Sequence, residues 1–307
     1  TARISNTSNP WIGGMLTASD ARAEPWVAVP MLAEGAESRG AVIVENCAVR
    51  RLDRAGGRIT GVYTEQGRIA CDQVVVAGGA WSSLFLRAEG VNIPQLSVLA
   101  SVAQTEPMPE IYAGNAADDL FAFRRRQAGS YTIPPGQDHD FFIGPDAFRH
   151  LFKYIPTLRN DWRKTTFRPV APPHYPDGWG TKRRWTGEDT SPFEHMRILN
   201  PAPNMDILSR VQDEFAACLP GLGRPKIKTA WAGMIDTMPD VVPILDHAPI
   251  PGLTIATGLS GHGFGIGPGL GRVVADMVRG RDPGHDLTRF RFNRFADGSA
   301  LKPHTGL

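Results

Sequence analysis

The glycine-rich stretch GLSGHGFGIGPGLG, residues 258–271, has the composition of a main chain that another group can approach closely. From Gly261 onward, every second residue in it is glycine. An apolar run at 253–257 precedes it. A helix beginning near Pro268 and ending at Gly280 is expected to follow, because apolar residues recur at helical spacing: Leu270, Val273, Val274, Met277 and Val278. A helix N-terminus carries partial positive charge and unpaired N–H groups, so an electron-rich group can rest there where no β-carbon intervenes.

The run does not fit the common phosphate-binding patterns. In a GxGxxG fingerprint, the third glycine would have to stand at one of four positions that hold other residue types: Ile266, Pro268, Leu270 or Arg272. The run also contains no GK[ST] of a P-loop. The glycines could simply permit a tight strand-to-helix turn, for which one or two would suffice. Six at alternate positions cost backbone entropy on folding, which favours a binding function.

A second strand, glycine turn and helix lies earlier in the chain. Residues 73–77 (QVVVA) form a continuous apolar run, the pattern of a strand buried on both faces. Gly78 and Gly79 separate this run from a predicted helix that carries Trp81. Both glycine segments are thus placed at the ends of apolar strands.

The remaining elements indicate a doubly wound α/β domain interrupted by a second domain. The expected elements are a helix over 25–39, strands over 41–44, 48–53, 58–64, 67–70, 95–104, 121–133 and 226–232, and a helix over 205–219. Between 133 and 205 the chain contains loop-like segments rich in Pro, Gly and aromatic residues. We therefore assign residues 1–94 and 234–307 to the α/β domain and residues 95–233 to an α+β substrate domain with an antiparallel sheet.

Composition excludes several classes of function. The net charge of +2 gives no field that would gather nucleic acid or an anionic membrane. The cysteines, Cys47, Cys71 and Cys218, have no metal-ligand spacing, so we expect a reducing compartment and no metal site. No apolar run approaches the roughly 18 to 20 residues that span a bilayer, and the first residues do not resemble a secretion signal. We expect a cytoplasmic protein.

Four blocks of sequence together resemble the D-amino-acid oxidase and sarcosine oxidase family of FAD-dependent oxidoreductases. They are RAEPWVAVPMLAEGAESRGAVIVENCAVRRL, VVVAGGAWSS, WAGMIDTMPDVVPIL and SGHGFGIGPGLGRVVADMVRG, in the family's order and across nearly the whole chain. The resemblance implies that the α/β domain binds FAD. It also implies oxidation of the C–N bond of an amine or amino acid, with hydride transfer to flavin N5.

The resemblance further implies which residues contact the cofactor. The segment around Ala48 and Val49 would touch the adenine end through its backbone. A second set would pass close to the diphosphate and the ring: Ala77, Gly78, Gly79 and Trp81. The loop against the flavin ring would consist of Gly261, His262, Gly263, Phe264, Gly265 and Ile266, with the helix N-terminus facing the N1 and C2 carbonyl region.

Three departures from the family's pattern change these expectations. No dinucleotide fingerprint precedes Pro25, so the N-terminal ADP-binding part is expected to be missing. Gly233 and Met234 stand where some sarcosine oxidases attach flavin through cysteine, so FAD is expected to be held non-covalently. Gly265 replaces a lysine that helps oxygen react in those oxidases, which makes a dehydrogenase as consistent with the sequence as an oxidase.

The substrate side rests on three candidate residues. Arg124, in the segment FAFRRRQAGSYTI, matches by its spacing to Gly129 an arginine of the family, and a guanidinium fork suits a carboxylate. Alternation along a strand would place Arg126 on the same side, and both could instead be solvated edge charges. Tyr131 could place a hydroxyl over the ring or be an ordinary strand tyrosine. His262 could hydrogen-bond flavin or substrate, or be structural.

Three explanations of the missing ADP-binding part stay open: a truncated sequence, a segment supplied by a second polypeptide, or a chain that has lost catalysis. The alternative to an enzyme is therefore a partner-dependent subunit that cannot hold FAD alone. In either case, strands that would flank the missing part should leave an exposed apolar edge.

Overall fold

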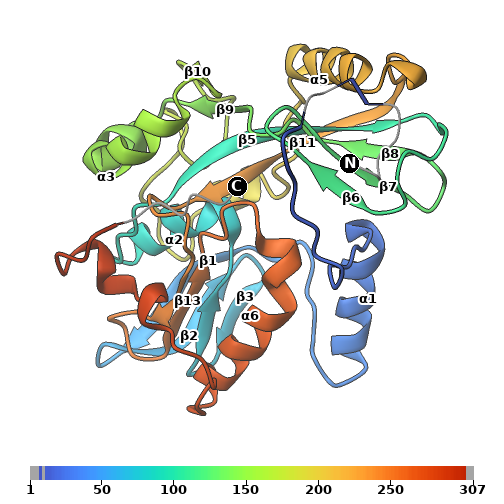
Figure 1. Cartoon of the computed structure of the whole chain (residues 1–307). Coiled ribbons are helices and arrows are strands. Elements are labelled where there is room, and N and C mark those ends of the chain that lie inside the picture. The colour runs from blue at the N-terminus through green and yellow to red at the C-terminus, as the bar shows by residue number, and fades with distance from the viewer. Residues whose placement is uncertain (1–6, 9–10, 302–307) are drawn as a thin grey trace. The chain divides into compact units, whose positions relative to one another are not determined.

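The computed structural model describes residues 7–8 and 11–301, and the chain divides into two compact units (Figure 1). The first unit contains Thr1–Ile43, Leu99–His139 and Asn200–Gly233. The second contains Val44–Val98, Asp140–Leu199 and Met234–Leu307. Two of these boundaries lie near those expected from the sequence, whereas the segments 1–43 and 140–199 are grouped differently.

The second unit contains two small sheets. The strands β12 (Ile244–His247), β13 (Leu253–Thr257) and β4 (Val74–Val76) form one sheet in the order β12-β13-β4, with β13 antiparallel to β12 and parallel to β4. The other is an antiparallel meander of β1 (Val49–Ala55), β2 (Arg58–Thr64) and β3 (Gly67–Ala70). Because β4 and β13 run in parallel, the two predicted glycine segments, which follow these strands, begin at the same end of the sheet.

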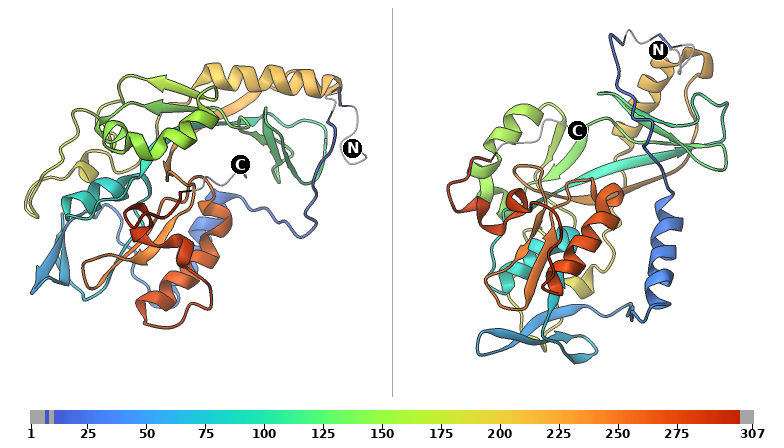
Figure 2. Two further views of the ribbon diagram at one scale, coloured as in Figure 1. Left: turned by 60° about the vertical axis from the view of Figure 1, so that its left-hand side comes forward. Right: turned by 60° about the horizontal axis from the view of Figure 1, so that its bottom comes forward.

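One apolar core supports these sheets. It includes Leu253 and Ile255 of β13, Val76 of β4, and residues of the meander and of α2 (Ser82–Ala88). Leu253 and Ile255 are completely buried, as is Ile244 on β12. Helix α6 (Gly263–Val278) follows β13 and lies along it, as both views of Figure 2 show. The glycine loop therefore follows a strand that is firmly packed in the core.

The first unit contains an antiparallel set of strands that packs against a helix. Its strands β6 (Asn115–Ala117), β7 (Ala122–Arg125) and β8 (Tyr131–Ile133) pair in sequence, and β8 pairs with β5 (Leu96–Thr105). Helix α5 (Met205–Cys218) buries Leu208, Val211 and Phe215 in a core shared with Phe123 and Ile133. Asn204 begins this helix by accepting hydrogen bonds from the backbone N–H groups of residues 206 and 207.

The remaining elements complete a larger sheet. Its order is β10-β9-β5-β8-β7-β6, and β11 (Ile227–Thr237) also pairs with β5. Strands β9 (His139–Phe142) and β10 (Thr165–Arg168) flank α3 (Pro145–Asp161), and α4 (Pro192–His195) is a single turn. The chain also contains α1 (Pro25–Glu37) in the first unit. No helix in the described part of the chain is both long and apolar enough to cross a bilayer.

Several expected elements were wrong in detail. The segment 41–44 forms no strand, and its Val42 is 86% exposed, because no neighbouring strand supplies hydrogen bonds for it in the described structure. The strand expected over 121–133 is a hairpin that turns at Gly129, whose φ is +77°. Part of the loop-like region folds into β9 and α3, since Pro145 suits the first turn of a helix.

The last helix begins five residues earlier than the sequence indicated. It starts at Gly263, so Pro268 lies inside it, and Gly263, Gly265, Gly267, Gly269 and Gly271 are helical residues. The expectation that the glycine run ends at the helix N-terminus is therefore wrong, because the run continues past that N-terminus into the helix. Residues 262–265 themselves form the positive end of the helix dipole.

Candidate functional site

The loop between β13 and α6 has an unusual backbone. Gly258, Ser260 and Gly261 have φ values of +79°, +50° and +88°. A non-glycine residue such as Ser260 adopts this region at a cost, and the surrounding structure must compensate. Ser260 does have such support: its N–H donates to the Asp236 carbonyl oxygen over 2.9 Å, and its hydroxyl donates to the Gly258 carbonyl oxygen over 3.2 Å.

The glycines after this loop leave the main chain uncovered. A β-carbon built on Gly265, Gly267 or Gly269 would meet no atom within 4 Å outside its own helical neighbourhood, and the same holds for Gly271. At Gly263 a β-carbon would meet only the side chain of Leu259. The main chain is thus open from Gly265 onward, whereas the Leu259 side chain lies against Gly263.

The first turn of α6 offers unpaired donors beside this open backbone. His262 is the residue that begins the helix, and no side chain caps its N-terminus. Apart from the Ile266 N–H, which donates to the His262 carbonyl oxygen over 3.3 Å, the N–H groups of the first turn have no partner within the helix. Phe264 and Ile266 are 44% and 42% exposed. The predicted loop residues, Gly261 to Ile266, are therefore together at an accessible helix end.

The second predicted glycine segment lies at the end of β4. Ala77 and Gly78 are exposed, and Gly79 has a φ of +52°, a conformation that favours glycine. Trp81 is half-buried and packs edge-on against Phe193, with ring centroids 5.3 Å apart. Since β4 and β13 are adjacent parallel strands, this turn and the glycine loop follow neighbouring strand ends.

A buried polar network joins the two segments. The side-chain amide of Gln95 donates to the Gly79 carbonyl oxygen over 2.9 Å, and the Thr257 hydroxyl lies 3.0 Å from the Gln95 side-chain oxygen. The same hydroxyl lies 3.3 Å from the carboxylate of Asp236. Asp236 in turn accepts the Gly258 N–H over 2.7 Å and the Leu259 N–H over 3.3 Å. Burial raises the pKa of Asp236, while these backbone bonds act in the opposite direction.

The predicted adenine contact at Ala48 is already engaged within the protein. The Ala48 N–H donates to the Glu65 carboxylate over 2.7 Å, and the Ala48 carbonyl oxygen accepts the Glu65 N–H over 3.1 Å. Arg197 bonds to the same carboxylate, and it lowers the pKa of Glu65. Val49 is the first residue of β1 and pairs with Thr64. Val49, the other predicted residue, has a side chain that is 37% exposed.

The arginines of the first unit behave as alternation predicted. The guanidinium groups of Arg124 and Arg126 both lie over the ring of Trp26, at 5.7 and 3.8 Å from its centroid. Arg125 pairs instead with Glu110. Arg124 also donates to the Ala23 carbonyl oxygen, and burial lowers its pKa. Its Nη1 is thus engaged by the segment that precedes α1, and its Nη2 lies 3.4 Å from the Thr132 hydroxyl.

Tyr131 is a core residue. Its side chain is completely buried, it packs edge-on against Phe123, and its hydroxyl accepts the Ile111 N–H over 2.9 Å. A hydroxyl placed over a substrate or a ring would have to be accessible, so we correct that expectation. The ordinary packing explanation accounts for Tyr131.

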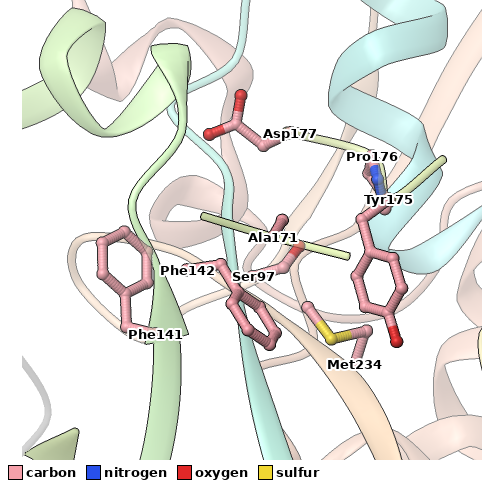
Figure 3. Close-up of a pocket in the computed structure, with 8 residues that line it drawn as sticks. All are labelled: Ser97, Phe141, Phe142, Ala171, Tyr175, Pro176, Asp177 and Met234. Atoms are coloured by element: carbon pink, nitrogen blue, oxygen red, sulfur yellow. The ribbon is translucent and has the colours of Figure 1, made fainter. Parts of the chain in front are cut away.

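A small pocket in the second unit is lined mainly by aromatic and apolar side chains (Figure 3). Phe142, Tyr175 and Met234 surround it, and the carboxylate of Asp177 points away from Tyr175 and Met234. That carboxylate instead accepts the Asp146 N–H at the start of α3 over 3.0 Å. Asp177 therefore serves the helix rather than the pocket.

Sequence reasoning missed Asp236, Thr257 and Gln95 as parts of the site. In the sequence, Asp236 and Asp240 lie on either side of Pro239, and turn chemistry alone explains residues of this type there. Asp236, Thr257 and Gln95 are polar residues at the ends of strands, beside the glycine segments. This is the one signal in the sequence that could have indicated them. Among the described residues, no group of three or more His, Cys, Asp or Glu side chains could hold a metal ion.

An open glycine backbone at a helix N-terminus, next to a parallel strand end, is the geometry that a planar cofactor at the end of an α/β sheet would need. The chain matches the model of the family described as FAD dependent oxidoreductase (DAO) over residues 1–277. It belongs to this family of flavoproteins, whose members use FAD.

Solved relatives share the fold. An L-amino acid deaminase from Proteus myxofaciens, solved in complex with anthranilate, is 28% identical with a TM-score of 0.86, and the match covers 96% of this chain and 66% of that one. An L-amino acid deaminase from Proteus vulgaris is 30% identical with a TM-score of 0.81, over 89% of this chain and 63% of that one.

Curated relatives are more distant and longer. The sarcosine oxidase subunit beta of Rhizobium meliloti is 23% identical over 87% of this chain and 51% of its own length. A D-amino acid dehydrogenase of Rhodopseudomonas palustris is 23% identical over 97% of this chain and 57% of its own length. The chain thus spans about half the length of the curated relatives it matches.

Proposed function

We propose that this chain is the flavin-ring half of an FAD-dependent oxidoreductase that oxidises the C–N bond of an amine or amino acid. The observation that carries the proposal is the open main chain at the start of α6, where a β-carbon on Gly265, or on Gly269 one turn later on the same face, would meet no other part of the protein. Such a surface at a helix N-terminus suits a flat ring that becomes negatively charged on reduction. The family membership supplies the identity of the ring.

The residues present fit FAD in distinct roles. The main chain of 261–266 would lie against the ring, and the turn of 77–79 with Trp81 would lie near the ring and the diphosphate. When bound, FAD supplies the acceptor for the hydride that leaves the carbon next to the substrate nitrogen. The positive end of α6 would favour the reduced, anionic state. We propose non-covalent attachment, because Gly233 and Met234 offer no nucleophile.

On the substrate side, the protein must mainly orient the amine and hold any carboxylate. We propose Arg124 for the carboxylate, with Trp26 and the Ala23 carbonyl oxygen holding its guanidinium in place. His262 is proposed as a hydrogen-bonding group at the ring, since it begins the helix on which the ring would lie. Substrate classes follow only from the relatives, which include sarcosine, D-amino acid and L-amino acid enzymes.

A second candidate function is a subunit that depends on a partner for its ADP-binding part. Two observations favour it. Helix α1 has no buried residue although it carries Trp26, Val29, Met31 and Leu32, all at least 45% exposed. In the second unit, β4 is an edge strand of its sheet and its Val75 is 39% exposed. A second polypeptide, or further chain, would cover such surfaces.

Anaerobic flavin reduction separates the two functions. The purified chain is mixed with FAD, gel-filtered, and titrated without oxygen with D-amino acids, L-amino acids, sarcosine and proline-like imino acids. Retained yellow colour that one of these substrates bleaches supports the enzyme. Retention of FAD without bleaching by any substrate class contradicts catalysis by this chain. Loss of all flavin on the column favours the partner-dependent subunit.

A further inference from the structure

Asp236 holds the glycine loop from two sides. Its side chain accepts the N–H groups of Gly258 and Leu259, and its backbone carbonyl oxygen accepts the Ser260 N–H. The carboxylate belongs to a residue only 9% exposed, and it comes from β11 rather than from the loop itself. One residue of a neighbouring strand therefore fixes three consecutive loop residues.

These bonds act where the backbone needs support. Gly258 and Gly261 have left-handed φ values, and Ser260 between them adopts +50° without being glycine. A strained non-glycine residue persists only when its surroundings hold it. The Ser260 hydroxyl also accepts the Met238 N–H over 3.3 Å, which ties the loop to the turn after β11.

The network extends from Asp236 to the other glycine segment. The Thr257 hydroxyl has one proton and three acceptors in reach, on Asp236, Gln95 and Gly79, at 3.3, 3.0 and 3.4 Å. Gln95 donates to the Gly79 carbonyl oxygen, so it contacts both Thr257 and the turn after β4. Thr257 and Gln95 are each 1% exposed, which removes competition from water.

We propose that Asp236 is a positioning residue that, through Thr257 and Gln95, holds the loop 258–261 and the turn 78–79 as one rigid cradle for the flavin ring. The inference rests on the proposed function for the identity of the ring. Asp236 touches the loop and not the reacting atoms. The order of the cradle is a property of the flavin-free chain, so it is tested separately from flavin binding.

The first test measures amide hydrogen exchange in the flavin-free, 15N-glycine-labelled chain. In Asp236→Ala, exchange at Gly258, whose N–H donates to the carboxylate, should rise by roughly tenfold to a hundredfold, the factor expected for losing a hydrogen bond to a charged group. Asp236→Asn keeps an acceptor at the same place, so it should restore most of the protection. Glycines in other elements, such as Gly61 of β2, should keep their wild-type rates.

A second pair of variants guards against simple failure to fold. Thr257→Val keeps the shape of the side chain and removes the hydroxyl whose single proton is within reach of Asp236, Gln95 and the Gly79 carbonyl oxygen. The 13C chemical shift of the Gly79 carbonyl, measured in the 13C-glycine-labelled chain, should therefore move. Thr254→Val is the matched control on the same strand: Thr254 is fully buried, but its hydroxyl lies 3.2 Å from the His247 ring. Thr254→Val should leave Gly79 and Gly258 unchanged.

The outcomes separate the inference from the proposed function. Equal changes at Gly79 in Thr257→Val and Thr254→Val, or unchanged exchange at Gly258 in a folded Asp236→Ala, would overturn the cradle. If Asp236→Ala unfolds, the Thr257→Val and Thr254→Val comparison decides alone. A second readout uses riboflavin, which lacks the ADP moiety: weaker binding to Thr257→Val than to Thr254→Val supports the role toward flavin. No riboflavin binding by the wild-type chain would instead count against the proposed function, with the exchange result left standing.

Discussion

The guanidinium of Arg294 and the carboxylate of Asp240 form a buried pair joined by two hydrogen bonds of 2.8 and 3.1 Å. The two side chains are 5% and 7% exposed, and Arg294 also donates to the Val242 carbonyl oxygen. The pair attaches the C-terminal segment to the turn before β12.

Removing Arg294 should destabilise the second unit strongly. In Arg294→Ala the buried Asp240 carboxylate loses its partner, and breaking such a pair typically costs about 3–5 kcal/mol. Chemical denaturation followed by circular dichroism measures the change in the free energy of unfolding. Arg291→Ala is the matched control, because Arg291 pairs with Asp297 at the surface, with 39% and 35% exposure, and should cost less than about 1 kcal/mol. Equal losses in the two variants would contradict the account.

Asp177 should give the stability of the second unit a distinctive pH dependence. Burial, with the nearby charge of Asp146, raises the pKa of Asp177 to about 6, from an ordinary value of 3.8. Between about pH 4 and 6 the folded state therefore holds a proton that the unfolded state has released. The stability that this proton provides is complete below pH 4 and is lost as pH rises through 6, by up to about 3 kcal/mol.

The variant Asp177→Asn isolates this effect. Its amide cannot titrate, so the difference in unfolding free energy between wild type and variant should shift with pH across this range. His150 acts in the opposite direction, because burial lowers its pKa to about 4, and stability is lost as pH falls below 6.5. His150→Gln should therefore steepen the loss of stability with rising pH. If the difference in unfolding free energy between wild type and Asp177→Asn stays constant from pH 4 to 7, the raised pKa of Asp177 is refuted.

The exposed apolar face of α1 should promote self-association rather than stability. Met31 and Leu32 are 64% and 61% exposed, and α1 buries no residue. The double substitution Met31→Glu and Leu32→Glu should leave the melting temperature within about 2 °C, since surface changes are usually worth less than about 0.5 kcal/mol. Sedimentation velocity should show fewer oligomers. A large drop in melting temperature would mean that α1 packs against the protein. Leu208→Glu, in the buried face of α5, is the positive control that should show such a drop.

Much of the local structure could be predicted from sequence because it depends on neighbouring residues. The alternation and turns of the meander predicted β2 and β3 to the residue, and the apolar run before the glycines predicted β13. The segment 41–44 has an equally apolar pattern but no strand, because a parallel strand needs a partner that local sequence cannot supply. The start of α6 was misplaced because Pro268 is a stronger local signal than the backbone that precedes it.

The site was predictable in its main chain and not in its side chains. The glycine spacing identified the loop and the turn after β4, since absent β-carbons are visible in a sequence. Asp236, Thr257 and Gln95 come together only through the pairing of strands distant in sequence, so their network needed the fold. Tyr131 shows the converse: its strand position was right, but its burial depends on α5 and on Phe123.

A bulky residue on the bare helix face should block flavin without harming the fold. Gly265→Leu places a side chain where no protein atom lies within 4 Å, and leucine favours the helix over glycine by roughly 0.5–1 kcal/mol. The melting temperature should therefore rise slightly, while riboflavin affinity falls by at least about tenfold. Gly271→Leu is the matched control, equally open and on the same helix but beyond the predicted ring contacts. Similar affinities for the two variants would place the ring elsewhere.

The most direct test of the central claim is a titration of the 15N-glycine-labelled chain with riboflavin, followed by amide chemical shifts. A flavin ring lying on the main chain of 261–265 should shift the amides of Gly261, Gly263 and Gly265 strongly, and leave those of Gly271 and Gly280 almost unchanged. Saturating riboflavin that leaves the first three amides in place, or that shifts only glycines outside this loop, would contradict the account.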